Sequence, residues 1–349
     1  MRLVGQIHIT VRGNMVRRDP TMWERLKGGL GAKVNLETGE VENELEATAV
    51  VDSTRRSLAK LGVTNALSLV IDDTTIFSDT QGRPDDLGDL ILALSEHASV
   101  FGRGFKELRF AAEHEEAGVH MVIETRARTK HLRDEPAAIV SVGGRIRTLE
   151  PFPGETADAY QARVEPLVKQ AGMLEASRLA FESFVQRLQA ALAAALPEAQ
   201  VVLEKTESRL VKPRSKDLAR PEQGPAQPMA PGYDPFVTYY PSPMGMMLDM
   251  MMFSTMMHMM MPSPMMLYSS GGAPIASLAD VQAEPSLASD DNIAYAEQTA
   301  AHDYSDDMSS VDEGGSVWDA AYDGDGGGGF ESSDGGGWDG GDSGGGFGD

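Results

Sequence analysis

Residues 108–128 read LRFAAEHEEAGVHMVIETRAR, and this stretch decides the class of fold. Two arms, residues 108–112 and 119–128, flank the polar segment 113–118, and apolar and polar side chains alternate along the second arm. Alternation with a period of two is typical of a strand, and a short connection containing glycine joins antiparallel strands. We therefore predict a β-hairpin here and a sheet that is largely antiparallel or mixed.

The segments on either side of the hairpin extend this pattern. Strand composition is found at 3–11, 45–51, 66–71, 138–149 and 199–204, and helical spacing at 22–30, 52–61, 85–97, 156–170 and 174–196. Strands that come before paired helices favour an α+β fold with helices packed on the sheet. The pair Gly143-Gly144 within one of these strands indicates a bulge or a close backbone contact.

The distribution of charge suggests where the folded part ends. Residues 1–220 carry 30 basic and 32 acidic side chains, whereas the 129 residues after Arg220 carry 21 acidic side chains and no basic one. A segment with charge of one sign repels itself and stays extended. We expect a globular domain at 1–212, a proline-rich linker at 213–243, a methionine-rich segment at 244–268 that could form a helix, and a disordered low-complexity acidic tail rich in glycine, serine and aspartate at 269–349.

Composition also excludes several classes of function. The chain has no cysteine, which excludes disulfides, thiolate zinc sites and a cysteine nucleophile. Residues 1–19 alternate apolar and polar side chains and lack the unbroken apolar run of a secretory signal, so we expect a cytoplasmic protein. The acidic tail would repel phosphate groups, so no nucleic acid is expected to bind through it. The sequence indicates no catalytic residues and no cofactor.

The methionine-rich segment allows several interpretations. Residues 244–266 hold 13 of the 20 methionines, and residues 244–261 would span about 27 Å as a helix. The segment could be an adaptable surface for a protein partner, a membrane-associated helix, a Cu(I) site assisted by His258, or a sticky segment without a partner. Asp249 and the lack of basic flanks oppose the membrane interpretation. The candidate contact residues are Met246, Met250, Met251, Phe253, Met257 and Met260.

Two histidines lie close to the hairpin turn. His114 and His120, with Glu113 or Glu116, could hold a metal ion if the turn made the two rings face each other. Histidines at a solvated turn more often carry no metal, and an HExxH motif is excluded because Gly118 stands at its second histidine position.

Basic residues gather on two of the expected strands. Arg126, Arg128 and Lys130 alternate along one strand, and Arg145 and Arg147 along the next. If these strands are neighbours, the five side chains form a basic patch for an anion or a partner; otherwise they are the solvated, salt-bridged face of a sheet. The nearest anion is the acidic tail of the chain, which suggests autoinhibition by the tail.

Aromatic residues punctuate that tail at intervals of four to nine residues, namely Trp318, Tyr322, Phe330, Trp338 and Phe347. Spaced aromatic side chains in a polar chain suit weak multivalent contacts and docking to a basic, apolar groove. We therefore expect a non-enzymatic interaction or scaffold protein that recruits protein partners or associates with itself. The alternatives are a membrane-associated accessory protein that engages lipid through residues 244–261, and an enzyme whose site the sequence does not reveal.

Overall fold

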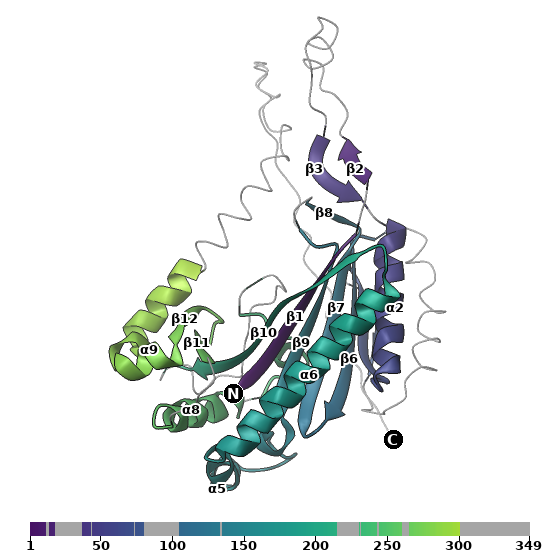
Figure 1. Cartoon of the computed structure of the whole chain (residues 1–349). Helices are drawn as coiled ribbons and strands as arrows, with labels where there is room; N and C mark the ends of the chain where they lie inside the picture. The colour runs from purple at the N-terminus through teal and green to yellow at the C-terminus, as the bar shows by residue number, and fades with distance from the viewer. Residues whose placement is uncertain are drawn as a thin grey trace, which may run out of the picture. The chain divides into compact units, whose positions relative to one another are not determined.

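Residues Met1–Tyr304 form one compact unit of the chain. A computed structural model describes residues 1–11, 14–17, 37–42, 44–72, 74–79, 105–132, 135–214, 230, 232–242, 244–259 and 265–300. Within these ranges the fold is α+β, as the sequence predicts, with helices packed on a mixed and mostly antiparallel sheet of nine strands (Figure 1).

The nine strands have the order β12-β11-β10-β1-β9-β7-β6-β4-β5. Their bounds are β1 (Arg2–Thr10), β4 (Asn65–Ile71), β5 (Thr74–Ser78), β6 (Glu107–Glu116), β7 (Val119–Arg128), β9 (Ala138–Ile146), β10 (Gln200–Lys212), β11 (Met265–Ser269) and β12 (Pro274–Ser277). The pair β10–β11 is parallel, and every other neighbouring pair in this sheet is antiparallel. A smaller sheet joins β2 (Asn14–Arg17), β3 (Glu37–Glu42) and β8 (Lys130–Leu132).

The predicted hairpin is formed by β6 and β7, and its turn is shorter than expected. Strand β6 runs on through Glu116, and only Ala117 and Gly118 connect the two strands. Both connecting residues have positive φ, 51° and 76°, which matches the twist of a two-residue hairpin. The polar residues 113–116 are therefore paired strand residues, and they line one end of the sheet.

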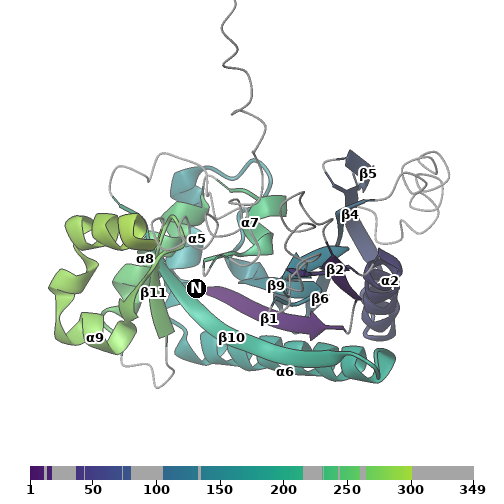
Figure 2. The same cartoon turned by 90° about the horizontal axis from the view of Figure 1, so that it is seen from above.

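Helices cover both faces of the sheet (Figure 2). One face packs against α2 (Glu44–Lys60) and α6 (Ala171–Ala195), and the other packs against α7 (Pro235–Tyr239). The predicted close contact at Gly143-Gly144 is confirmed. A Cβ atom on Gly144 would lie 2.9 Å from the ring of Phe181 in α6, and one on Gly143 would lie 2.3 Å from Oδ1 of Asp234, the N-cap of α7. The two glycines thus let helices approach the same strand from opposite sides.

The remaining helices are α5 (Ala157–Val168), α8 (Gly245–Met256) and α9 (Leu278–Ala283), with short 3₁₀ turns at Arg147–Leu149 and Pro285–Ala288. Residues 290–300 are also helical.

The strand predicted at 45–51 is wrong, because these residues form the first half of α2. Ala47, Val50, Val51, Thr54 and Leu58 are buried at intervals of three and four residues, so the apolar face is helical throughout. The β-branched pair Val50-Val51 is typical of a strand. Packing of this face against α6, β6 and β7 nevertheless makes these residues helical.

The folded unit extends well beyond the boundary expected near residue 212. Strand β11 pairs with β10, α8 packs on β10 and α5, and α9 packs on β11 and β12. Four of the seven carboxylates in residues 232–300 form ion pairs with basic residues of the earlier segment, namely Asp234–Arg145, Asp249–Arg2, Asp290–Lys212 and Glu297–Arg214. Charge of one sign therefore does not keep the described residues of this segment, 232–242, 244–259 and 265–300, extended, because opposite charge comes from residues distant in sequence.

Candidate functional site

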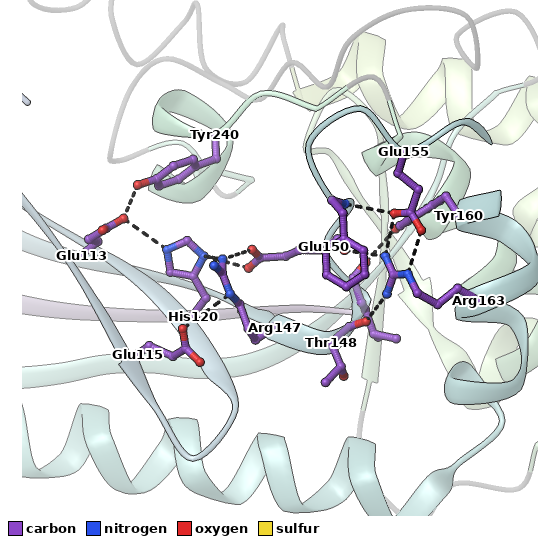
Figure 3. A network of polar contacts seen from close by, with 12 residues as sticks. Glu113, Glu115, His120, Arg147, Thr148, Glu150, Glu155, Tyr160, Arg163 and Tyr240 are labelled. Atoms are coloured by element: carbon purple, nitrogen blue, oxygen red, sulfur yellow. Dashed lines mark hydrogen bonds and ion pairs between the residues drawn. The ribbon is translucent and has the colours of Figure 1, made fainter. Parts of the chain in front are cut away.

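A pocket of about 380 Å³ lies at the end of the sheet where the β6–β7 hairpin meets the segment after α7. Its lining residues are Gly62, Thr64, Asn65, Glu113, His114, Glu115, His120, Arg147 and Tyr240. Figure 3 shows how the polar side chains at one wall converge on His120. Several interacting titratable side chains line this cavity, so we treat it as the candidate site.

His120 lies between two carboxylates. Its Nδ1 is 2.8 Å from Oε1 of Glu150, and its Nε2 is 3.3 Å from Oε2 of Glu113 (Figure 3). The residue is only 7% exposed. Because both partners are acceptors, both ring nitrogens carry a proton and the ring is an imidazolium.

This geometry changes two pKa values in opposite directions. Burial lowers the pKa of His120, but the hydrogen bonds to Glu113 and Glu150 outweigh it and raise the pKa to about 9. The hydrogen bond from His120 lowers the pKa of Glu113 to about 2; burial opposes this, while donors from Tyr240 and Asn65 assist. The pair is therefore fully ionised at neutral pH.

Glu150 is held beside His120 by the turn before α5. Arg163 of α5 donates to the backbone oxygens of Thr148 and Glu150, at 2.6 and 2.8 Å, and forms an ion pair with Glu155 at 2.8 Å (Figure 3). Arg147 donates to Oε2 of Glu150 at 2.6 Å. The backbone bonds fix the turn, so Glu150 accepts from His120 and from Arg147 at once.

The segment around α7 closes the site from above the sheet. Tyr240 donates to Glu113, and its ring and that of Phe236 lie 5.1 and 5.0 Å from the ring of His120. Deeper on the same face, Glu124 accepts from Tyr233 and from Tyr239, the latter at 3.1 Å. Burial, followed by the charge of Glu124, raises the pKa of both phenols, which stay protonated donors.

These aromatic residues were missed by sequence reasoning, which assigned residues 213–243 to an extended linker. That expectation is corrected for the described residues 232–242, which are packed on the sheet. A signal was present in GYDPFVTYY, residues 232–240. Asp234 caps α7 by accepting from the backbone N–H of Phe236 at 3.1 Å, and Pro235 occupies the first helical position. Aromatic and apolar residues around a capped start indicate a packed helix rather than a spacer.

The predicted basic patch is not a continuous cationic surface. Strands β7 and β9 are neighbours, as the patch requires, but the basic residues lie at separate places along them. Arg126 and Arg128 lie 3.4 and 3.6 Å from carboxylate oxygens of Glu107. Arg145 is buried and paired with Asp234 at 2.7 Å, and Arg147 is paired with Glu150. Lys130 is exposed at the start of β8. The salt-bridged alternative describes this face better.

The two histidines do not face each other. His114 stacks on Phe184 of α6, with ring centroids 5.4 Å apart, whereas His120 contacts α7 on the opposite face of the sheet. His120 lies directly across from Glu115, the residue that follows His114 in its strand. Because successive strand residues point to opposite faces of a sheet, His114 and His120 point to opposite faces. Within the described residues, no group of three histidine, aspartate or glutamate side chains could hold a metal ion. The structure therefore does not bring His114 and His120 together as a pair of ligands.

The methionine-rich candidates fall into two groups. Met246 of α8 is buried in the folded unit and cannot serve as a contact surface without unfolding. Met250, Met251, Phe253 and Met257 are half-buried, and Met260 lies outside the described residues. The expected helix exists, and no helix in the described ranges has the length and apolar character needed to cross a bilayer.

The tail residues Trp318, Tyr322, Phe330, Trp338 and Phe347 lie outside the described residues, as do the helices predicted at 22–30 and 85–97. No known protein family, curated protein or solved structure matches this chain.

Chemically, the site around His120 is suited to holding charge and not to moving protons at neutral pH. An imidazolium has no lone pair with which to accept a proton, and Glu113 already accepts from three donors. A general base requires a pKa near the working pH and a vacant lone pair directed at the substrate. The arrangement therefore supports a fixed polar wall that joins the hairpin, the turn before α5 and the segment after α7.

Proposed function

We propose that this chain is a non-enzymatic interaction protein, in which the folded unit Met1–Tyr304 carries an acidic, aromatic-spotted segment that recruits a basic protein partner. The observation that carries the proposal is that basic side chains of the folded unit already form ion pairs within it. Arg2, Arg145, Lys212 and Arg214 are all paired with carboxylates of residues 234–297. Other arginines, such as Arg163, are paired with carboxylates nearer in sequence.

The sequence also gives the last segment, residues 305–349, a surplus of negative charge that the rest of the chain does not offset. Residues 305–349 contain 12 acidic side chains and no basic one, and the unit Met1–Tyr304 contains 41 acidic and 30 basic side chains, a net charge of −11. Because a unit that is itself net negative cannot neutralise this surplus, the opposite charge is expected from another molecule. The five aromatic side chains of this segment supply apolar contacts between the charges, which favours a partner surface that is basic and apolar together. Autoinhibition by the tail is less favoured, because the proposed basic patch is already ion-paired.

The test measures binding of a fluorescein-labelled peptide of alternating lysine and leucine to the full-length chain by anisotropy, at low and at high salt. One variant exchanges the 12 acidic residues of 305–349 for their amides, and a second exchanges the five aromatic residues for serine. We expect the first variant to lose most of the salt dependence, and the second to bind about tenfold more weakly at every salt concentration. A glutamate–leucine peptide is the control probe.

Binding of the lysine–leucine peptide that is unchanged in the first variant would contradict the proposal. Salt-dependent binding of an isolated 305–349 peptide to the first variant would favour autoinhibition instead. Sedimentation of the full-length chain, at several concentrations and with lipid vesicles, tests self-association and engagement of a membrane surface.

A further inference from the structure

The pocket at His120 lies where two neighbouring strands end at different places. Strand β4 begins at Asn65, which pairs with Glu113, whereas β6 runs on to Glu116. Among the described residues, 114–116 have no partner in β4, and the pocket of about 380 Å³ lies at this step in the sheet. Pockets that hold small molecules have volumes of roughly 300–1,000 Å³, so the space is large enough for a ligand.

Three hydrogen-bond donors at the wall of this pocket are already used within the wall. His120 donates to Glu150 at 2.8 Å and to Oε2 of Glu113 at 3.3 Å. Tyr240 donates to the same oxygen of Glu113. The side-chain amide of Asn65 donates to the other oxygen, Oε1, at 2.5 Å. These donors hold the wall together, and their bonds to a ligand would have to replace bonds that already exist.

Two groups at the pocket retain the capacity to accept hydrogen bonds. Asn65 is only 7% exposed, and its buried Oδ1 accepts no hydrogen bond. An amide oxygen left in this state costs free energy, which a donor from a ligand would recover. The side chain of Glu115 is 54% exposed, and its carboxylate lies 3.5 Å from Nε of Arg147, longer than a charge-assisted hydrogen bond of about 2.7–2.9 Å. The pocket therefore suits a ligand that donates.

The charges around the pocket favour a cation over a neutral donor. Glu113, Glu115 and Glu150 carry three negative charges, and they are joined to each other through the two positive charges of His120 and Arg147 (Figure 3). This connected group of five side chains has a net charge of −1. One additional positive charge would balance it.

The tyrosine at the pocket is affected by the same negative charge. Burial raises the pKa of Tyr240, and the hydrogen bond to Glu113 and the charges of Asp79 and Glu150 raise it further. The electrostatic potential at this wall is therefore negative. The face of a tyrosine ring is itself electron-rich, which makes it a favourable neighbour for a cation.

We propose that this pocket binds a guanidinium or primary ammonium group, with the carboxylate of Glu115 and Oδ1 of Asn65 as acceptors and the ring of Tyr240 as one wall. Such a group supplies one positive charge and only N–H donors, which matches what the surrounding side chains lack. It can belong to a free small molecule or to a basic side chain of a peptide. The site lies within the folded unit Met1–Tyr304, so its occupancy does not require the acidic segment 305–349.

The test is a ligand-observed NMR titration of the full-length chain with n-butylguanidinium, and with n-butylurea as an uncharged probe of the same shape. We expect saturable binding of n-butylguanidinium, and binding of n-butylurea that is weaker by about tenfold or more. Glu115→Gln should weaken binding of n-butylguanidinium about tenfold, because the amide keeps the size of the side chain and loses its charge. The chain with the 12 acidic residues of 305–349 exchanged for amides should bind this probe as the wild-type chain does, which separates the pocket from the tail.

The matched control is Glu116→Gln. It removes the same charge from the same end of the hairpin, but Glu116 pairs with Arg187 at 2.5 and 2.7 Å and does not line the pocket. Its effect on affinity should be less than about twofold, because solvent and salt screen a charge outside the site. Equal affinity for the two probes, no saturable binding to the wild-type chain, or an equal loss in the Glu115 and Glu116 variants would overturn the proposal.

A third probe, the tripeptide acetyl-Gly-Arg-Gly-amide, distinguishes the two sources of the cation. Binding of the tripeptide that is weakened by Glu115→Gln would assign the pocket to an arginine side chain of a peptide. Exclusion of the tripeptide, with binding of n-butylguanidinium retained, would assign it to a free small molecule. Both results support a cation site and differ only in the molecule that carries the group.

Discussion

The ion cluster at His120 predicts a specific dependence of stability on pH. The pKa of His120 is raised from 6.5 to about 9 in the folded state, because Glu113 and Glu150 accept hydrogen bonds from both ring nitrogens. A raised folded-state pKa means that the folded protein binds this proton more tightly than the unfolded chain does. The resulting stabilisation is fully present below pH 6.5 and is lost as the pH rises through 9.

The size of this effect follows from the difference between the two pKa values. Each pKa unit corresponds to about 1.4 kcal/mol, so the free energy of unfolding should fall by on the order of 3 kcal/mol between pH 6.5 and pH 9. The side chain of His120 is well shielded from water, so solvent screening reduces this figure only slightly.

The assay is urea unfolding of the wild-type chain and of His120→Gln at unit steps from pH 6 to pH 10. The difference in unfolding free energy between them should be largest at pH 6 and should shrink as the pH rises. His114→Gln is the matched control, because its ring stacks on Phe184 on the other face of the sheet. A difference that does not change with pH, or an NMR titration of His120 centred near pH 6.5, would refute the reasoning.

Two further predictions concern packing and charge. Gly143→Ala places a Cβ atom 2.3 Å from an oxygen of Asp234 and should lower the unfolding free energy by about 1–3 kcal/mol. Gly172→Ala, within α6 and with no atom near the added Cβ, should raise it by up to about 1 kcal/mol, so equal urea midpoints would contradict this account. Asp249→Asn leaves the buried guanidinium of Arg2 without its carboxylate and should cost about 3–5 kcal/mol in the same assay. A cost below 1 kcal/mol would show that the pair is solvated.

The elements that were predicted correctly have their determinants close together in sequence. The hairpin of β6 and β7 depends on residues within a single segment, 107–128. Helix α6 carries its whole buried face, from Leu174 to Leu192, at a spacing that needs no knowledge of the partner. The pair Gly143-Gly144 indicated either a bulge or a close backbone contact, and the structure has the close contact.

The candidate site could not be assembled from the sequence, because its parts come from distant segments. His120 and Glu113 lie on one hairpin, but Glu150 belongs to the turn before α5 and Tyr240 to the segment after α7. Neither strand pairing nor local charge indicates which carboxylate a buried histidine will contact. His114 and His120 lie near one turn without meeting, because residues on the two arms of a hairpin can point to opposite faces of the sheet.

The amino-acid sequence and the tertiary structure differ most clearly in what they establish about the chain after Arg220. The amino-acid sequence alone establishes that all basic side chains precede this residue, that no cysteine is present, and that methionines cluster in 244–266. It does not establish that residues 232–300 belong to the fold. That was decided by tertiary contacts such as Arg2–Asp249, which join residues 247 positions apart. The physical reason is that electrostatic attraction depends on distance in space, so a segment of one charge stays extended only when no opposite charge is folded against it.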